Sequence, residues 1–397
     1  MPAIAVPSEG DLVAVALPPS ERWLEVVTDV WEAGAAILPV DHRLGPEGKV
    51  AEHHRARPTV VLDEDGVRRV GGIPVDDGVA LVVPTSGTGG EPRLVQFGRD
   101  AIDAAVAASA LALDATPHDR WLCCLPLAHI GGLLVVLRGV LLGTPVTVHP
   151  TFDVGAVAAE RDATMTSLVP TMLVRLLDAD VDLSAFRAIL SGGAHLDPEV
   201  RERAERARVH VIETYGLTES CGGVVYDGLP LPGADVRIDD SGGIELRGPT
   251  LMLGYRFDPD GTRDAFSDDG WLRSGDVGEL DGGGRLRVTG RLDDLINTGG
   301  EKVWPHPVER VLRSHTKIGE VGVGGRPDRE WGQRVVAWVV PLDPNDPPDL
   351  DEIRDHVAAT LPRHHAPREL VLVDRLPTTT SGKVRRGALR GSTAEQE

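Results

Sequence analysis

The sequence predicts an α/β protein, and three observations along its 397 residues lead to that fold class. Short apolar runs of strand length alternate with stretches of helical periodicity as far as residue 232, which is the pattern of sheets covered by helices. From residue 233 the chain becomes rich in Gly and Asp, as expected for hairpins with tight turns. Beyond Leu292 the alternation returns, over a segment long enough to form a small α+β domain.

The strands and helices expected before residue 233 follow from the changes in apolar period. One strand ends on Gly192 and Gly193, and the last strand leads into Thr214, Tyr215 and Gly216. In chain order, the expected elements are strand 80–83, helix 100–114, strand 121–125, helix 131–142, strand 145–148, a strand and then a helix within 165–177, strand 187–191, helix 197–207 and strand 209–213.

The stretch from residue 233 to residue 292 is expected to be all-β. Asp-Gly and Gly-Gly turns fall within 234–248 and 278–290, so each of these segments predicts a hairpin. The expected elements after it are helix 306–314, strand 319–324, strand 334–341, helix 350–361 and strand 369–373. The residues from Arg386 onward are expected to fray, as chain termini commonly do.

Charge and composition exclude several classes of protein. The formal net charge is −20, whereas a nucleic-acid partner calls for a basic stripe. The 3 cysteines give no paired framework, which suits a reducing compartment. The N-terminus lacks a basic region before an apolar core, and the most apolar run, 130–143, is too short to span a membrane. We therefore expect a cytoplasmic protein with no nucleic-acid partner and no membrane span.

A loop of small and hydroxyl residues follows the strand at 80–83. Its sequence from Pro84 to Arg93 is PTSGTGGEPR, in which glycines let backbone amides approach phosphate oxygens and hydroxyls add donors. The spacing is not that of a Walker loop. A flexible turn explains the segment about equally well.

Two further segments carry groups that suit a nucleotide. Residues 215–220 (YGLTES) combine a ring for stacking on a base with a hydroxyl and a carboxylate that suits Mg²⁺, although a capped strand-to-helix junction has the same pattern. In residues 274–278 (SGDVG), an Asp can accept hydrogen bonds from vicinal hydroxyls, and Arg291 follows. The alternative for this pair is a β-turn Asp with a surface ion pair.

The fourth segment is Thr378–Arg386 (TTTSGKVRR), where a single Lys on a Ser-Gly loop could deliver a mobile charge. A basic patch on the tail is the competing interpretation. Together and in this order, the four segments resemble the adenylate-forming superfamily of acyl-CoA synthetases, nonribosomal adenylation domains and luciferases. The resemblance runs nearly end to end, and it includes the segments 31–40 (WEAGAAILPV), 125–129 (LPLAH) and 191–194 (SGGA).

The resemblance implies a division into two domains. Residues 1–292 would form a large N-terminal AMP-binding domain of α/β subdomains with a β-barrel-like subregion. Residues 293–397 would form a small, mobile C-terminal α+β domain, with the hinge at Asp293. A homodimer is the default assembly that the resemblance implies.

The resemblance also implies ATP and Mg²⁺ as cofactors and CoA as co-substrate. Thr218 would contact the α-phosphate, Glu219 would bind Mg²⁺, and Lys383 would bridge the acyl carboxylate and the α-phosphate. The residues that would bind the rest of ATP are Thr85, Ser86, Gly87, Thr88 and Arg93 for the β- and γ-phosphates, Gly192, Gly193, Ala194 and Tyr215 for adenine, and Asp276 and Arg291 for ribose. Gly299 and Gly300 would line the tunnel for the pantetheine arm of CoA.

Two positions depart from the superfamily pattern in the phosphate loop. Gly89 stands where a Thr or Ser is usual, and Arg93 stands where a Lys is usual. The charge is kept and a hydroxyl is lost, so the handling of pyrophosphate is expected to differ.

The substrate is expected to be a small carboxylic acid. The segment 221–231 (CGGVVYDGLPL) and the Leu-Pro-Leu-Ala-His run resemble those of actinobacterial-type 2-succinylbenzoate–CoA ligases of menaquinone biosynthesis. His129 would then lie at the wall of the acid pocket as a donor, although a lone His is more often a packed structural residue. Three alternatives stay open: a ligase for another aryl or short aliphatic acid, a degenerate nucleotide-binding relative, and an adenylation domain that loads a separate carrier.

Overall fold

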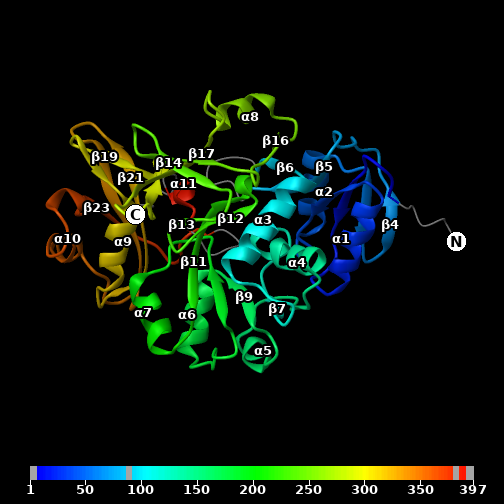
Figure 1. Ribbon diagram of the computed structural model, residues 1–397. Coiled ribbons are helices and arrows are strands. Elements are labelled where there is room, and N and C mark those ends of the chain that lie inside the picture. Colours follow the sequence, from blue (N-terminus) through cyan, green and yellow to red (C-terminus); the bar gives the residue numbers. More distant parts are fainter. Residues whose placement is uncertain (1–6, 86–91, 379–383, 390–397) are drawn as a thin grey trace.

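A computed structural model gives the fold of residues 7–85, 92–378 and 384–389. Its strands form four sheets, of seven, seven, four and five strands. Figure 1 shows the N-terminal sheet at one end of the molecule, the second sheet in the middle and the C-terminal sheet at the other end.

The first sheet has a parallel centre with antiparallel edges, in the order β16-β6-β5-β2-β1-β3-β4. Its central strands are buried on both faces, which explains their unbroken apolar sequences, such as LVAV in β1. The strands are β1 (Leu12–Val15), β2 (Ala36–Pro39), β3 (Val60–Asp63), β4 (Gly66–Arg69), β5 (Val79–Pro84), β6 (Leu94–Gly98) and β16 (Gly254–Tyr255). The helices of this region are α1 (Arg22–Glu32), α2 (Pro46–Ala56) and α3 (Arg99–Ala112).

The second sheet has the order β13-β12-β11-β10-β9-β7-β8 and is parallel from β8 to β11. Its strands are β7 (Trp121–Cys123), β8 (Val146–Val148), β9 (Met165–Leu168), β10 (Ala188–Ser191), β11 (Val211–Leu217), β12 (Gly222–Tyr226) and β13 (Leu229–Pro230). Its helices are α4 (Ile130–Leu142), α5 (Val154–Ala159), α6 (Pro170–Asp178) and α7 (Pro198–Arg206).

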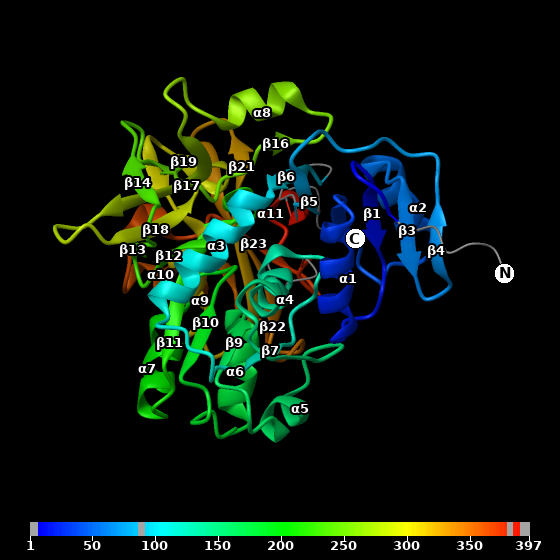
Figure 2. The same cartoon turned by 45° about the vertical axis from the view of Figure 1, so that its right-hand side comes forward.

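Helices α3 and α4 lie between these two sheets (Figure 2). Helix α4 is apolar almost all round, as a helix enclosed by protein should be. It packs on α1 of the first sheet and on β7, β9 and β12 of the second, so the two sheets share one large core.

The third sheet is antiparallel and open, with the order β14-β15-β17-β18. Its strands are β14 (Asp235–Ile238), β15 (Gly243–Arg247), β17 (Leu272–Leu280) and β18 (Leu286–Arg291). The expectation of an all-β stretch is wrong between β15 and β17. There the chain leaves to add β16 to the first sheet and then forms α8 (Pro259–Ala265), which Asp258 caps through the Gly261 amide.

The C-terminal sheet has its own apolar core, built from residues 296–366. Its strands are β19 (Ile296–Thr298), β20 (Glu301–Val303), β21 (Ile318–Asp328), β22 (Gly332–Pro341) and β23 (Glu369–Leu372), with α9 (Pro305–Arg313) and α10 (Leu350–Ala358) beside them. The described residues also form three short 3₁₀ turns: η1 (Thr218–Ser220), η2 (Leu292–Asp294) and η3 (Arg363–His365).

The expected fraying from Arg386 is wrong for the residues that the structure describes. Arg386–Leu389 form α11, and the Arg386 guanidinium lies 2.7 Å from Glu309 and 3.0 Å from Asp294. Glu309 is buried, so this ion pair fixes the segment to α9. No helix among the described residues is long and apolar enough to cross a membrane.

Candidate functional site

Loops at the carboxyl ends of two buried strands carry the expected nucleotide residues. Strand β5 ends at Pro84 and leads into Thr85, and β10 ends at Ser191 and leads into Gly192. Carboxyl ends of parallel strands are where α/β folds bind ligands. A Cβ at Gly192 would lie 2.3 Å from the Thr214 hydroxyl oxygen, so only glycine lets this loop pass so close to β11.

Tyr215, Asp276 and Arg291 meet at one point. The Tyr215 hydroxyl donates to Asp276 Oδ2 at 2.9 Å, and Arg291 Nη1 lies 3.5 Å from Asp276 Oδ1. Asp276 and Arg291 are direct partners of β17 and β18. Asp276 is buried within β17, so the alternative of a β-turn Asp with a surface ion pair is wrong.

The electrostatics of this group keep Tyr215 protonated. Burial raises the pKa of Tyr215 well above its usual value, and the neighbouring Asp276 carboxylate adds to that effect. The phenol is therefore a hydrogen-bond donor at neutral pH. Its bond orients the Asp276 carboxylate, a group that can accept hydrogen bonds from a pair of hydroxyls.

Glu219 lies in η1, directly after β11, and its carboxylate oxygen Oε1 accepts a 2.9 Å hydrogen bond from the Tyr255 hydroxyl. The capping pattern in this segment is also present, because Ser220 Oγ accepts from the Leu217 amide at 2.9 Å. The capping interpretation is therefore confirmed, and the nucleotide role of the segment stays a prediction. The cap shapes the turn, and the turn presents Thr218 and Glu219.

The two ends of the phosphate loop are joined to each other. The Thr85 amide donates to the Arg93 carbonyl at 2.8 Å, and the Arg93 amide donates to Thr85 Oγ1 at 3.0 Å. The Arg93 guanidinium lies over the Tyr255 ring, 4.8 Å from its centroid. Arg93 and Glu219 thus both contact Tyr255, and Thr85 is joined to Arg93 through the backbone.

The donor set fits a magnesium ion that a nucleotide helps to hold. Glu219 is half-buried, and its Oε2 has no hydrogen-bond partner among the described residues. The described residues contain no cluster of three or more His, Cys, Asp or Glu that could enclose a metal by themselves. Mg²⁺ typically takes one or two carboxylates together with substrate phosphates, which this arrangement matches.

His129 occupies the N-cap of α4, next to a close helix–strand contact. Burial lowers the pKa of His129, so its imidazole is neutral at pH 7. Gly222 in β12 packs directly on α4, because a Cβ there would lie 2.4 Å from Leu134 Cδ1. His129 precedes this contact along the chain, and the charges of Asp41 and Arg43 act on its imidazole.

Comparison with known proteins decides the family. Residues 63–256 match the AMP-binding enzyme family, and residues 307–383 match the C-terminal domain of AMP-binding enzymes. A probable 2-succinylbenzoate–CoA ligase from Mycobacterium tuberculosis is 41% identical over 82% of this chain and 87% of its own length. The chain belongs to the AMP-binding enzyme family.

Other members of the AMP-binding enzymes extend this comparison. The 2-succinylbenzoate–CoA ligase of Bacillus licheniformis is 34% identical over 86% of this chain and 77% of its length. Among solved structures, the o-succinylbenzoate CoA synthetase of Bacillus subtilis in complex with the acyl-adenylate intermediate OSB-AMP has a TM-score of 0.88 at 28% identity, covering 97% of this chain and 89% of the other. ATP-bound MatB from Rhodopseudomonas palustris has a TM-score of 0.86 at 25% identity, covering 96% and 88%.

Some of the expected site residues lie outside the described residues, and two others lie in a turn of the C-terminal sheet. Ser86, Gly87, Thr88 and Lys383 lie outside the described residues. Thr378 and Val384 form a β-bridge that closes the base of the Lys383 segment. Gly299 and Gly300 form the turn between β19 and β20, where the Gly299 amide donates to the Trp331 carbonyl at 2.8 Å and Gly300 is exposed.

Sequence reasoning missed Tyr255, which the structure places between Arg93 and Glu219. The available signal was weak, since Gly254-Tyr255 is a two-residue strand inside a loop. Only its pairing with β6 reveals the role, and β6 lies more than 150 residues earlier in the chain.

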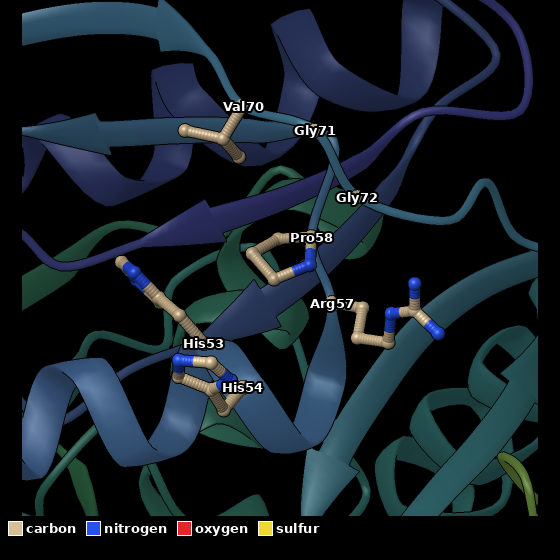
Figure 3. Close-up of a pocket in the computed structure, with 7 residues that line it drawn as sticks. All are labelled: His53, His54, Arg57, Pro58, Val70, Gly71 and Gly72. Atoms are coloured by element: carbon tan, nitrogen blue, oxygen red, sulfur yellow. The ribbon is translucent and has the colours of Figure 1, made fainter.

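A surface pocket of about 520 Å³ lies elsewhere, between α2 and the segment after β4 (Figure 3). Seven residues line it: His53, His54, Arg57, Pro58, Val70, Gly71 and Gly72. None of them belongs to the nucleotide group. The pocket is therefore not the site at which the expected residues meet.

Proposed function

We propose that this protein is an ATP-dependent acid–CoA ligase, and that its acid is 2-succinylbenzoate. Such an enzyme adenylates a carboxylate and then transfers the acyl group to the thiol of CoA. The proposal rests on the side chains that meet at the strand ends, taken together with the similarity of this chain to a ligase. Tyr215, Asp276 and Arg291 meet on the strand that leads into Glu219, in a chain that is 41% identical to a probable 2-succinylbenzoate–CoA ligase.

The first half-reaction makes the acid electrophilic. A carboxylate oxygen attacks the α-phosphorus of ATP, the bond to the β-phosphate oxygen breaks, and pyrophosphate leaves. Mg²⁺ supplies charge neutralisation on the phosphates, and Glu219 would hold it. Asp276 and Arg291 would fix the ribose, Thr218 and Lys383 would contact the α-phosphate, and Arg93 would receive the departing pyrophosphate.

In the second half-reaction the CoA thiolate attacks the acyl carbon, and AMP leaves. The same cleft must admit the pantetheine arm, so the small domain has to present a different face. We place the domain boundary at 292/293 with the hinge at Asp293, and we assign Gly299 and Gly300 to the tunnel. The separate core of residues 296–366 supports a C-terminal unit that moves as one body.

The acid pocket would combine an apolar slot with one donor. The contact of Gly222 with Leu134 offers an apolar wall, and the neutral His129 imidazole can donate a hydrogen bond to a substrate carboxylate or keto oxygen. An aromatic acid with a second carboxylate matches that combination. We extend the proposal to a cytoplasmic protein that forms a homodimer and has no nucleic-acid partner. Sedimentation at micromolar concentration would test the dimer.

The test is exchange of labelled pyrophosphate into ATP, followed by AMP release in the presence of CoA. We expect 2-succinylbenzoate to support both reactions and Lys383→Ala to abolish the exchange, because the cation that bridges acid and phosphate is gone. A panel of benzoic, fatty and short aliphatic acids gives the specificity. The acid assignment is wrong if 2-succinylbenzoate is inert while another acid reacts, and no exchange with any acid indicates a degenerate relative.

A further inference from the structure

We infer that Tyr255 is a positioning residue for the nucleotide site: its hydroxyl orients the Glu219 carboxylate for Mg²⁺, and its ring holds the Arg93 guanidinium beside the phosphate loop. The inference deepens the proposed function and rests on it for the identity of the ligand, Mg·ATP. It is carried by the contacts that Tyr255 makes on three sides.

The backbone around Tyr255 is fixed from both sides of the site. Strand β16 pairs Tyr255 with Val95, two residues after Arg93, and the Tyr255 amide donates to Thr262 Oγ1 at 2.8 Å. Just upstream, the Met252 amide donates to the Glu219 carbonyl at 2.9 Å. The segment therefore ties the strand that leaves the phosphate loop to the turn that carries Glu219.

The hydroxyl of Tyr255 acts on Glu219. The residue is 8% exposed, and its phenol donates to the Glu219 carboxylate. The 2.9 Å bond occupies one lone pair of Oε1. It fixes the carboxylate plane and leaves Oε2 for a cation. Hydrogen bonds to a ligating carboxylate typically contribute 10–100-fold in metal affinity.

The ring of Tyr255 acts on Arg93. The guanidinium stands 4.8 Å from the ring centroid, and its Nε lies 3.6 Å from Asp258 Oδ2, just before α8. A cation over an aromatic face is attracted by the ring, which favours one position of a long side chain. The hydrogen bonds between Arg93 and Thr85 fix the backbone position from which the Arg93 side chain extends.

Two substitutions separate the hydroxyl from the ring. Tyr255→Phe keeps the ring under Arg93 and removes only the bond to Glu219. We expect the Mg²⁺ concentration for half-maximal ATP binding, measured by calorimetry, to rise about tenfold. ATP affinity without Mg²⁺ should stay within twofold of the parent. Tyr255→Leu removes the ring as well, and it should also weaken Mg²⁺-free ATP binding by roughly threefold.

Two control variants give the range against which the Tyr255 variants are compared. Thr166→Val removes another buried hydroxyl bond, from Thr166 Oγ1 to the Leu122 carbonyl at 2.9 Å. Thr166 lies in β9 of the second sheet, whereas β16 belongs to the first, so this variant should leave both titrations unchanged. Glu219→Gln should shift the Mg²⁺ titration at least as far as Tyr255→Phe. Unfolding midpoints measured for every variant show whether each one is folded.

The outcomes distinguish this inference from the proposed function. It is overturned if Tyr255→Phe gives the parent Mg²⁺ titration while Glu219→Gln shifts it, or if neither variant shifts it. The ring's role is overturned if Tyr255→Leu and Tyr255→Phe bind Mg²⁺-free ATP equally. If the parent binds Mg·ATP with the expected shifts but shows no acid-dependent exchange, the proposed function fails and the role of Tyr255 stands.

Discussion

Asp119 is a single carboxylate that joins three segments, each leading into a strand of the second sheet. Its side chain is 3% exposed and accepts from Arg187 Nε at 2.6 Å, from Thr164 Oγ1 at 2.9 Å and from the Thr116 amide at 2.7 Å. Arg187 also donates to the Leu113 carbonyl, just past α3. The partners lie up to 68 residues apart, so no local pattern in the sequence could have revealed this junction.

Asp119→Asn should lower the free energy of unfolding by about 2 kcal/mol at pH 7, because it leaves Arg187 without its charged partner. The bond from Arg187 lowers the pKa of Asp119 below its usual 3.8. A carboxyl pKa that is lower in the folded state stabilises above the unfolded pKa, and the contribution is lost as pH falls below it. Urea unfolding of both proteins should therefore show a difference that is full at pH 6 and narrows below pH 4. A difference that stays constant down to pH 3 would contradict this account.

Strand β11 carries Tyr215 and leads into Thr218 and Glu219, and a bulge between Tyr215 and Gly216 shifts its register with β12. The sequence predicts a strand that ends at residue 213, whereas β11 continues to Leu217. It continues because β12 returns antiparallel and satisfies its backbone groups, a pairing that apolar periodicity does not encode. The parallel strands of the two large sheets, with their continuous apolar runs, were predicted close to their observed bounds, for example β5 and β10.

Gly216→Ala tests the close approach of β11 and β12. A Cβ at this position would lie 1.9 Å from the Gly222 carbonyl oxygen, and a backbone oxygen cannot move without breaking the pairing. We expect a loss of about 1–3 kcal/mol in unfolding free energy and at least tenfold weaker ATP binding, because Tyr215 and Glu219 shift with the strand.

The matched control for that variant is Gly282→Ala, where a Cβ would meet no described atom within 4 Å and the backbone is not left-handed. It should keep the parent ATP affinity and lose no stability. Thermal unfolding and calorimetry give both quantities. Parent-like ATP binding by Gly216→Ala would show that the β11–β12 contact does not position the site.

At the scale of the whole molecule, the two units adopt a specific arrangement. The chain matches the synthetase from Bacillus subtilis in complex with OSB-AMP at a TM-score of 0.88. It matches a double mutant of that enzyme bound with the product analogue OSB-NCoA at only 0.67, over the same 97% of this chain. The order of motifs predicts two units, but it holds no information on their relative orientation, because that depends on surface contacts between distant residues.

One such contact joins His195, just after the loop at Gly192, to His306 in α9. The two imidazole rings meet edge to face with centroids 4.8 Å apart. His195 also lies 3.4 Å from Glu213. Burial and the nearby His195 lower the pKa of His306 to about 4, against a partial opposing effect of Glu309.

The direction of the His306 pKa shift predicts that the packing of His306 on His195 loses stability in acid. His306 is neutral when packed on His195, and it takes up a proton below pH 6.5 once the units separate, so the packed arrangement loses stability as pH falls from about 6.5 toward 4. Pyrophosphate exchange should therefore fall on the order of tenfold more than thioester formation from a supplied acyl-adenylate between pH 7 and pH 5. His306→Gln should abolish that difference, because an amide does not titrate. His195→Ala should reduce it, because it removes one of the groups that lower the pKa of His306. Identical pH profiles for the parent and His306→Gln, with both proteins folded at pH 5, would show that this contact does not govern the arrangement of the two units.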